Sequence, residues 1–362
     1  MLVKVANFLI LSLYFLVLAV VLDVGPIKPN FATLVLGMLG LAVFVIILSS
    51  LAKSIDLVDK PDDKRKNHLG AIPLIGGLSI FISLVYGAIL LGINDFFQVL
   101  LISLIPLIII GILDDLRGIS VIPRLIVQVL ASWIVIIFTD VYLRDLGDLF
   151  GQGVVELNEF GIPFTIFCVV GICNAFNMLD GKDGLTGSVS LLVLIGLMIL
   201  LNFNGYDYQL GMILIPTLLV FLAFNMNLFG INRKVFLGDH GALGLGHLIA
   251  WNLIYFTQEV NVMTPASALW IIFYPLTDTL VTFLRRLRSD RSIFKPDRYH
   301  LHFILTDKGL SDIKVYLIII GISFTGAFFA VLSNLFNISD YLILYAYLTG
   351  LFFFFLITKK SI

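Results

Sequence analysis

Apolar stretches of about twenty residues, separated by short polar segments, recur along the whole chain, and about twenty is the length a helix needs to cross a bilayer. A helix is also the only open-ended structure that satisfies its own backbone in lipid. The pattern therefore predicts an all-α polytopic transmembrane helix bundle of about 11–12 helices. The predicted helices cover residues 5–24, 31–52, 73–93, 97–113, 122–139, 162–179, 185–202, 209–226, 241–258, 265–284, 315–333 and 340–358.

The first apolar stretch follows a single Lys4 and has the position of a signal peptide. It is long, and no small-x-small cleavage site precedes Pro26, so we predict a retained extra N-terminal helix within residues 1–30. No sequence repeat, low-complexity linker or soluble domain interrupts the pattern, and the 362 residues are predicted to form one integral membrane domain.

Composition supports the same class. The chain is 59% hydrophobic and 13% charged, with a mean hydropathy of +1.05, more apolar than a soluble domain needs to be. The net charge of -1 gives no reason to expect a nucleic-acid partner. Cys168 and Cys173 share one apolar segment, and no disulfide is expected.

The basic residues lie mostly on one side of the predicted bundle. Of the 23 Lys and Arg residues, only Lys28 and Arg144 fall on the other side, where the stretch from Asp140 to Gly161 is predicted to form a small hairpin near Val154 to Leu157. The positive-inside rule assigns the basic side to the cytoplasm, together with both termini. The loops on that side cover residues 53–72, 114–121, 180–184, 227–240 and 285–314.

A charged run lies in the first of these loops, between Asp59 and His68, and the pair Gly76–Gly77 opens the helix that follows. Basic side chains beside a glycine-rich helix start suit an anion such as diphosphate, although an ordinary positive-inside loop has the same composition. The candidate anion-binding residues are Lys60, Arg65, Lys66 and His68.

Two adjacent carboxylates, Asp114 and Asp115, end the fourth predicted helix. Like charges side by side raise each other's pKa unless a cation lies between them, so the pair is a candidate metal site or proton acceptor. Taken alone, two solvated carboxylates at a helix end are the more common explanation of such a pair.

The sixth predicted helix ends in Asn174, Asn177 and Asp180, and Asp183 follows. The asparagines share one face of the helix and lead to the carboxylates. Hydrogen bonds between helices would explain the asparagines alone but not the Asp-Gly-x-Asp-Gly run after them.

A single carboxylate, Asp239, lies between glycines just before another predicted helix. Glycines permit close approach of a ligand to the backbone, so Asp239 is a candidate ligand of a cation, with a simple helix cap as the alternative.

The last cluster contains Arg298, His300 and His302, which we expect on an extended loop that binds phosphate oxygens. Two histidines without a further ligand are weak evidence for zinc, and the oxygen ligands elsewhere favour magnesium or manganese. His247 and Asp278 lie within apolar helices, and structural roles are predicted for both.

The five clusters lie on one surface and describe aspartates for a cation, basic groups for phosphates and apolar walls for a lipid. In these residues the chain resembles the polyprenyl-phosphate N-acetylhexosamine-1-phosphate transferases, and most of all the WecA type. The resemblance covers about Asp59 to Leu310 and is carried by DKPDDKRKNHLGAIPLIGG, ILDDLRGIS, NAFNMLDGKDGLTG, VFLGDHG and PDRYHLH.

The resemblance implies a catalytic core at 53–314 that transfers a sugar 1-phosphate from a UDP-sugar to undecaprenyl phosphate and releases UMP, with N-acetylglucosamine as the expected sugar and another N-acetylated sugar as the alternative. It implies a bacterial inner-membrane enzyme with Mg²⁺ bound by Asp239 and Asp115. Asp114 would position or deprotonate the lipid phosphate. Asp180 and Asp183 would hold the nucleotide or complete the metal shell. Direct attack by the lipid phosphate is favoured, and an enzyme-phosphate intermediate is left open. The implied substrate-binding residues are Lys60, Arg65, Lys66, His68, Asn174, Asn177, Arg298, His300 and His302.

The chain departs from the family at three positions, with Phe303 in place of a further histidine and His240 and Ala242 in place of alanine and serine. These departures leave the identity of the UDP-amino sugar open, as the sequence leaves open a monomer or a homodimer. A secondary transporter is the competing interpretation, but transporters place their charges near the bilayer midplane, often in two repeated halves. A non-catalytic scaffold would not need five such clusters.

Overall fold

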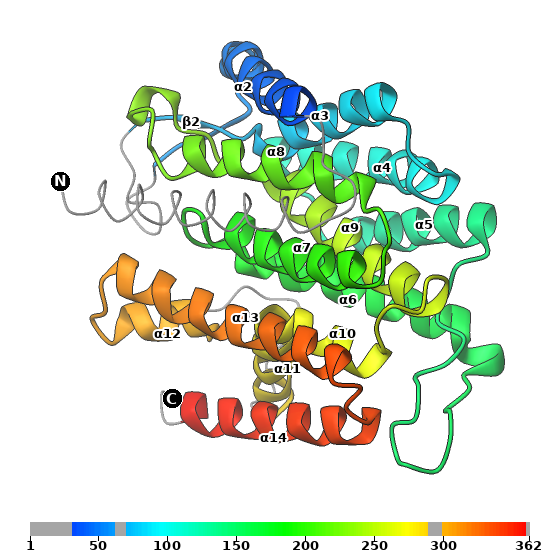
Figure 1. Ribbon diagram of the computed structural model, residues 1–362. Coiled ribbons are helices and arrows are strands. Elements are labelled where there is room, and N and C mark those ends of the chain that lie inside the picture. Colours follow the sequence, from blue (N-terminus) through cyan, green and yellow to red (C-terminus); the bar gives the residue numbers. More distant parts are fainter. Residues whose placement is uncertain (1–30, 62–69, 289–298, 360–362) are drawn as a thin grey trace.

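Long helices dominate the computed structural model, which describes residues 31–61, 70–288 and 299–359, with only the backbone described for 31–39, 288 and 359. Most of them run side by side along one direction, with α11 crossing that direction (Figure 1). The elements are α2 (Phe31–Ser54), β1 (Val58–Asp59), β2 (Ile72–Pro73), α3 (Gly76–Leu91), α4 (Asp95–Arg117), α5 (Val121–Thr139), η1 (Asn158–Phe160), α6 (Gly161–Leu179), α7 (Leu185–Phe203), α8 (Gln209–Asn225), η2 (Ile231–Arg233), α9 (Asp239–Gln258), α10 (Pro265–Ile271), α11 (Phe273–Arg288), α12 (Leu301–Asp307), α13 (Asp312–Leu335) and α14 (Asp340–Lys359).

The predicted helical membrane bundle is confirmed. Six stretches of the described chain are helical, long enough and apolar enough to cross a bilayer, and many of their large apolar side chains face outward, as a lipid environment allows. The predicted helix at 5–24 lies outside the described residues. The six stretches are Asp95–Arg117, Val121–Thr139, Asn158–Leu179, Leu185–Phe203, Asp312–Leu335 and Asp340–Thr358.

The prediction of one continuous helix over 265–284 is wrong. The chain bends by 88° between α10 and α11, at Ile272. Pro275 supplies the physical reason, because in a continuous helix its ring would clash with the carbonyl of Ile271 and it has no N–H to donate. Beyond the bend, α11 crosses the direction of the other helices (Figure 1), and Asp278 on α11 contacts the start of α12.

A small antiparallel pair of strands, which the sequence did not indicate, closes the basic loop. Val58 in β1 pairs with Pro73 in β2. The segment that follows is tied to the start of α9, because Phe236 N donates to the Pro73 carbonyl at 2.9 Å and Gly77 N donates to the Leu237 carbonyl at 2.9 Å. The base of the basic loop is thereby fixed beside Asp239.

Helix α9 lies in the middle of the bundle and packs closely on α3, α4 and α6. Glycines make this approach possible: a Cβ atom on Gly77 would lie 2.2 Å from Gly241 Cα, and one on Gly111 would lie 2.3 Å from His240 Cα. Farther along, a Cβ on Gly246 would lie 2.7 Å from Cys173 Cα. Any larger side chain at these positions would push the helices apart.

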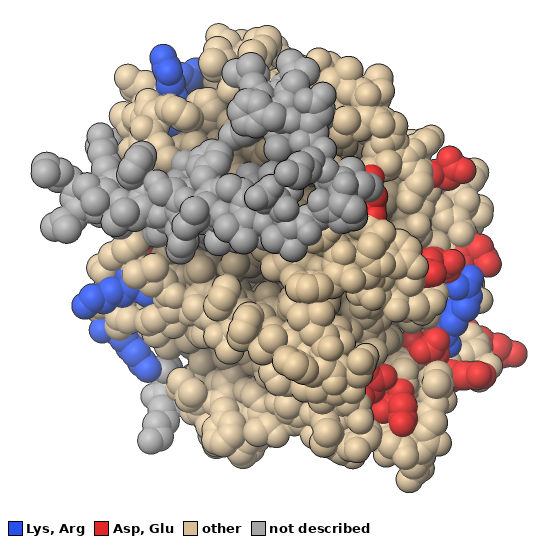
Figure 2. Space-filling view, viewed as in Figure 1, with Lys and Arg blue, Asp and Glu red and all other residues tan. Residues whose placement is uncertain are grey.

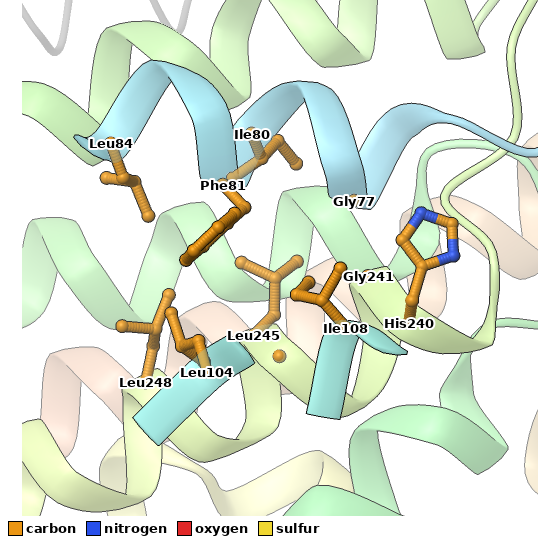
Figure 3. Close-up of a pocket in the computed structure, with 11 residues that line it drawn as sticks. Gly77, Ile80, Phe81, Leu84, Leu104, Ile108, His240, Gly241, Leu245 and Leu248 are labelled. Atoms are coloured by element: carbon orange, nitrogen blue, oxygen red, sulfur yellow. The ribbon is translucent and has the colours of Figure 1, made fainter. Parts of the chain in front are cut away.

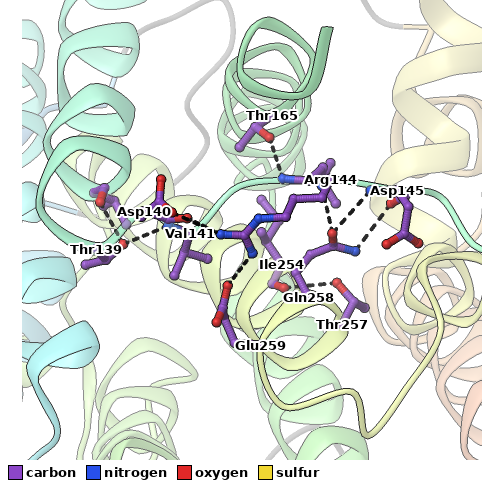
Figure 4. A network of polar contacts seen from close by, with 12 residues as sticks. Thr139, Asp140, Val141, Arg144, Asp145, Thr165, Ile254, Thr257, Gln258 and Glu259 are labelled. Carbon is purple, nitrogen blue, oxygen red and sulfur yellow. Dashed lines mark hydrogen bonds and ion pairs between the residues drawn. The ribbon is translucent and has the colours of Figure 1, made fainter. Parts of the chain in front are cut away.

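The far end of α9 anchors the long loop of residues 140–161 (Figure 4). The Arg144 guanidinium donates to Glu259 at 2.7 Å, and the Arg144 backbone N–H donates to Gln258 Oε1 at 2.7 Å. A single antiparallel bridge joins Asp145 to Glu156, and backbone hydrogen bonds from Leu146 N to the Val155 carbonyl at 3.0 Å and from Leu157 N to the Arg144 carbonyl at 2.8 Å flank it, so the predicted hairpin is present and short. The visible basic and acidic side chains gather at opposite ends of the molecule, apart from one basic group among the acidic ones (Figure 2).

Candidate active site

Asp114 and Asp115 occupy the last turn of α4, which ends at Gly118 in the left-handed region with φ of 67°. Both carboxylates are largely buried, with 7% of each side chain exposed. Asp114 accepts a hydrogen bond from Ile119 N at 2.5 Å and forms an ion pair with Arg124, so its oxygens are already engaged by protein groups. A buried charge needs such partners to be tolerated.

Asp239 is the first residue of α9, following Gly238 with φ of 78°, a conformation that glycine adopts without strain. Its backbone N–H donates to Asp115 Oδ1 at 3.1 Å, and its carboxylate lies 3.9 Å from Arg124. With 38% of its side chain exposed, Asp239 is more accessible than Asp114 or Asp115. The end of α4 and the start of α9 therefore bring three carboxylates and one guanidinium together.

Asp180 follows the last residue of α6 and lies where the site opens to the surface. The dense protein around it desolvates its carboxylate, and the negative charges of Asp115 and Asp183 oppose ionisation further, so the pKa of Asp180 is raised to about 7. Hydrogen bonds that join the loop after α6 to the segment before α9 and to Asn225 place that loop in the same site.

Asp183, half exposed, accepts from Lys234 Nζ at 2.5 Å, and the Lys234 side chain is only 8% exposed. Asn225 ties the same two segments together, because its Oδ1 accepts from Gly184 N at 2.5 Å and its Nδ2 donates to the Val235 carbonyl at 2.9 Å. These contacts fix the loop after α6 against the segment that leads to Asp239.

The two asparagines of α6 have different surroundings. Asn174 Nδ2 donates to Gln128 Oε1 on α5 at 2.8 Å and to the Val170 carbonyl of its own helix at 2.7 Å. The bond to Gln128 is the hydrogen bond between helices that was the alternative explanation of the asparagines. Asn177 Oδ1 is buried without a hydrogen-bond partner in the described part of the chain. Asn177 is therefore the asparagine with an oxygen left to orient a ligand or a water.

The expectation of an extended histidine loop is wrong for the second histidine, because His302 lies within the short helix α12 and His300 precedes its first residue. Asp278 on α11 organises this turn: its Oδ2 accepts from His300 Nδ1 at 2.7 Å and its Oδ1 accepts from Leu301 N at 2.9 Å. The carboxylate satisfies one of the free N–H groups at the start of α12. The structural role predicted for Asp278 thus consists of holding His300.

His302 is fully buried, and neither ring nitrogen has a hydrogen-bond partner among the described residues. Desolvation lowers the pKa of His302 to about 4, so the ring is neutral at pH 7. A Cβ on Gly181 would lie 2.7 Å from His302 Nε2, which places α12 directly against the loop that carries Asp180 and Asp183. A neutral imidazole there offers one N–H to a phosphate oxygen rather than a positive charge.

The structure brings together most of the predicted residues that it describes, with one difference. Lys60 is exposed and forms an ion pair at 2.7 Å with Asp56, which precedes it by four residues. Among the described residues, no contact joins Lys60 to the carboxylates of the site. His247 has the predicted packing role, with Nε2 2.9 Å from Ser103 Oγ. The predicted residues Arg65, Lys66, His68 and Arg298 lie outside the described residues.

Three supporting residues were missed: Arg124, Asn225 and the partner role of Lys234. Arg124 had a readable signal, because a cation in the first turn of an apolar helix ten residues after an acidic pair has few other partners. Asn225 had none, since its two contacts join segments that are distant in sequence.

No group of three or more His, Cys, Asp or Glu side chains able to hold a metal ion occurs in residues 31–61, 70–288 and 299–359. Magnesium does not require one, because it is usually bound by one or two carboxylates together with substrate phosphates and water. The exposed Asp239 beside Asp115 provides such a pair, so these residues fit a magnesium ion.

Comparison with known proteins agrees with this geometry. The family model described as glycosyl transferase family 4 matches residues 97–257. Proteins named undecaprenyl-phosphate alpha-N-acetylglucosaminyl 1-phosphate transferase are similar to the chain. The Escherichia coli K12 protein is 35% identical over 285 residues, covering 76% of each chain. The Yersinia pestis protein is 36% identical over 281 residues with the same coverage, and the Haemophilus influenzae protein is 35% identical over 336 residues, covering 90% of this chain and 91% of its own.

Proposed function

The chain belongs to glycosyl transferase family 4, and from that premise we propose that it transfers N-acetylglucosamine 1-phosphate from UDP-N-acetylglucosamine to undecaprenyl phosphate. An oxygen of the lipid phosphate attacks the phosphorus that carries the sugar. The bond from that phosphorus to the oxygen of the nucleotide phosphate breaks, and UMP leaves. The product is the lipid diphosphosugar.

The observation that carries the proposal is the convergence of three acidic segments and one histidine segment at one end of the bundle. Asp115 accepts from Asp239 N, Asp183 pairs with Lys234, and His302 packs against Gly181. Phosphoryl transfer requires alignment of two phosphates and neutralisation of their charge more than covalent participation of the protein. A site with exposed carboxylates beside cations and neutral donors suits two phosphate groups and a cation.

The proposed roles follow from the existing contacts of each side chain and from the oxygen or nitrogen atoms that could still bind a ligand. Asp239 and Asp115 would hold Mg²⁺, which when bound neutralises diphosphate charge. Asp180 and Asp183 face the nucleotide side from the loop after α6, and His302 donates a hydrogen bond to a phosphate oxygen. Asp114 already pairs with Arg124, which favours a positioning role over proton abstraction. The lipid phosphate loses its second proton with a pKa of about 6, so a base is not required near neutral pH.

The proposed location is the bacterial inner membrane, with the site on the cytoplasmic face. The basic side chains gather toward the end of the molecule where β2 and α12 lie, and the positive-inside rule assigns such an end to the cytoplasm. UDP-sugars are soluble and reach the site from that side.

The direct test is release of UMP by the purified protein in detergent with UDP-N-acetylglucosamine and undecaprenyl phosphate, with and without magnesium. Metal-dependent UMP release is expected. The variant Asp239→Ala should stay folded in the membrane and lose turnover, and near-normal activity would remove Asp239 as a metal ligand.

The outcome without UMP separates two alternatives. UMP from another UDP-N-acetylated sugar would keep the chemistry and change the donor. If no UDP-sugar gives UMP, the secondary transporter becomes the favoured interpretation, which predicts substrate uptake into vesicles and no UMP.

A further inference from the structure

His240 is a buried polar residue that the proposed function does not use. It follows Asp239 in α9, where the family resemblance leads us to expect alanine, and its side chain is fully buried. Its Nδ1 lies 2.7 Å from Asp115 Oδ2. An ionised carboxylate can only accept, so Nδ1 carries the hydrogen and donates.

Apart from the contact with Asp115, the described surroundings of the His240 ring are apolar. Its Nε2 is buried without a partner in the described part of the chain. The side chain lines a cavity of about 10 Å³ whose other walls are apolar side chains and glycines of α3, α4 and α9 (Figure 3). Such a space is at the lower limit of size for one water, and its apolar walls offer a water few hydrogen-bond partners.

Burying an imidazole with one unsatisfied nitrogen has an energetic cost, and an apolar side chain would avoid it. Two glycines also accommodate the ring: a Cβ on Gly77 would lie 2.8 Å from His240 Cδ2, and one on Gly238 would lie 2.7 Å from His240 Nδ1. Among the residues that the structure describes, the one side-chain hydrogen bond that offsets this cost is the bond to Asp115.

That hydrogen bond completes a two-point grip on Asp115. Asp239 N donates to Oδ1 and His240 Nδ1 donates to Oδ2. Each Asp115 oxygen therefore accepts one hydrogen bond, and the two donors belong to the first two residues of α9. The last torsion of an aspartate is soft, and a single donor would leave the carboxylate plane free to rotate. Each oxygen keeps a further lone pair for a cation.

We propose that His240 is a positioning residue that fixes the plane of the Asp115 carboxylate relative to Asp239 and thereby sets the affinity of the site for a divalent cation. The inference rests on the proposed function, because it takes Asp115 and Asp239 as the cation ligands. Groups that orient metal ligands from behind typically change metal affinity by about 10- to 100-fold when they are removed.

The test compares His240→Ala, which removes the donor, with His240→Asn, whose amide can donate from nearly the same place. Mn²⁺ binding to the detergent-purified protein, measured by electron paramagnetic resonance without substrate, is the primary readout. The magnesium concentration for half-maximal UMP release is the second. His240→Ala should weaken both by about 10-fold or more, with the KM for the UDP-sugar at saturating magnesium unchanged, and His240→Asn should recover most of the loss.

His247→Ala is the matched control. His247 is also fully buried in α9, about two turns from His240, and its hydrogen bond goes to Ser103. This control should lower the thermal unfolding midpoint and leave cation affinity unchanged.

The proposal is overturned if His240→Ala binds Mn²⁺ like the wild type, or if a folded His240→Asn is as impaired as His240→Ala. A wild-type protein that releases no UMP with any donor would instead refute the proposed function, so the two failures are distinguishable.

Discussion

Asp278 allows a quantitative test of how the histidine segment is held. The Asp278 side chain is buried on α11 and accepts two hydrogen bonds, from His300 Nδ1 at 2.7 Å and from Leu301 N at 2.9 Å. Asp278→Ala leaves both donors without their acceptor and releases the start of α12. A hydrogen bond to a charged group contributes about 1.5–3 kcal/mol.

We expect the activation free energy to rise by about the contribution of one such hydrogen bond, because His300 no longer lies in its place. At about 1.36 kcal/mol for each factor of ten, the rate falls by roughly 10- to 150-fold. The assay is UMP release at saturating magnesium by protein whose folding is checked by size-exclusion chromatography. Asp278→Asn, which keeps one acceptor oxygen and the shape of the side chain, should fall between Ala and the wild type.

The matched control is Glu259→Ala, which removes an acidic partner of Arg144 at the other end of α9. Exposed ion pairs contribute about 0–1 kcal/mol, so this variant should keep its activity within a factor of about five. A folded Asp278→Ala with more than half of the wild-type rate would refute the idea that Asp278 positions His300 for the reaction.

Three further predictions concern the loop after α6 and α12. Gly184→Ala should lower the thermal unfolding midpoint, because Gly184 has φ of 75° and an added Cβ would lie 2.9 Å from Met226; an unchanged midpoint would argue against strain there. The pKa of Asp180 is raised to about 7 in the folded protein, above its value in the unfolded chain, so the folded protein binds this proton more tightly. The stability that the bound proton contributes is complete below about pH 4 and is lost as pH rises through 7. Thermal unfolding between pH 5 and 8 without divalent cations should show this decline, and Asp180→Asn should flatten it. Phe303 packs on His302 at 4.1 Å between ring centroids, and Phe303→His should change the preference among UDP-amino sugars; an unchanged substrate profile would exclude Phe303 as a determinant.

Hydropathy predicted the helices well because a span needs only length and apolar composition, which are local properties. The break between α10 and α11 was missed although Pro275 marks it, because α4 and α8 continue through Pro106 and Pro216 without ending. A proline in an apolar stretch therefore allows either outcome, and the neighbouring helices decide which occurs.

The acidic motifs of the site could be found from sequence because carboxylates recur beside asparagines, glycines and basic residues at helix ends on one predicted side of the bundle. Their partners could not be paired in the same way. Nothing local assigns Lys234 to Asp183 or Asp278 to His300, since each pair forms only when distant segments meet. The sequence likewise marked His240 as unusual without indicating that it faces Asp115.

The distances along the chain between the partners also set an order of assembly during synthesis. Asp114 and Arg124 are 10 residues apart and can pair as soon as α4 and α5 are in the membrane. The two donors to Asp115 come 124 and 125 residues later, after α5, α6, α7 and α8 have been made. Until α9 docks against Gly77 and Gly111, the bundle can be inserted and still have no competent site. A ribosome-bound chain that stops short of α9 is therefore expected to be membrane-integrated and inert, and activity should appear only when α9, and after it α11 and α12 with the histidine segment, have joined the bundle.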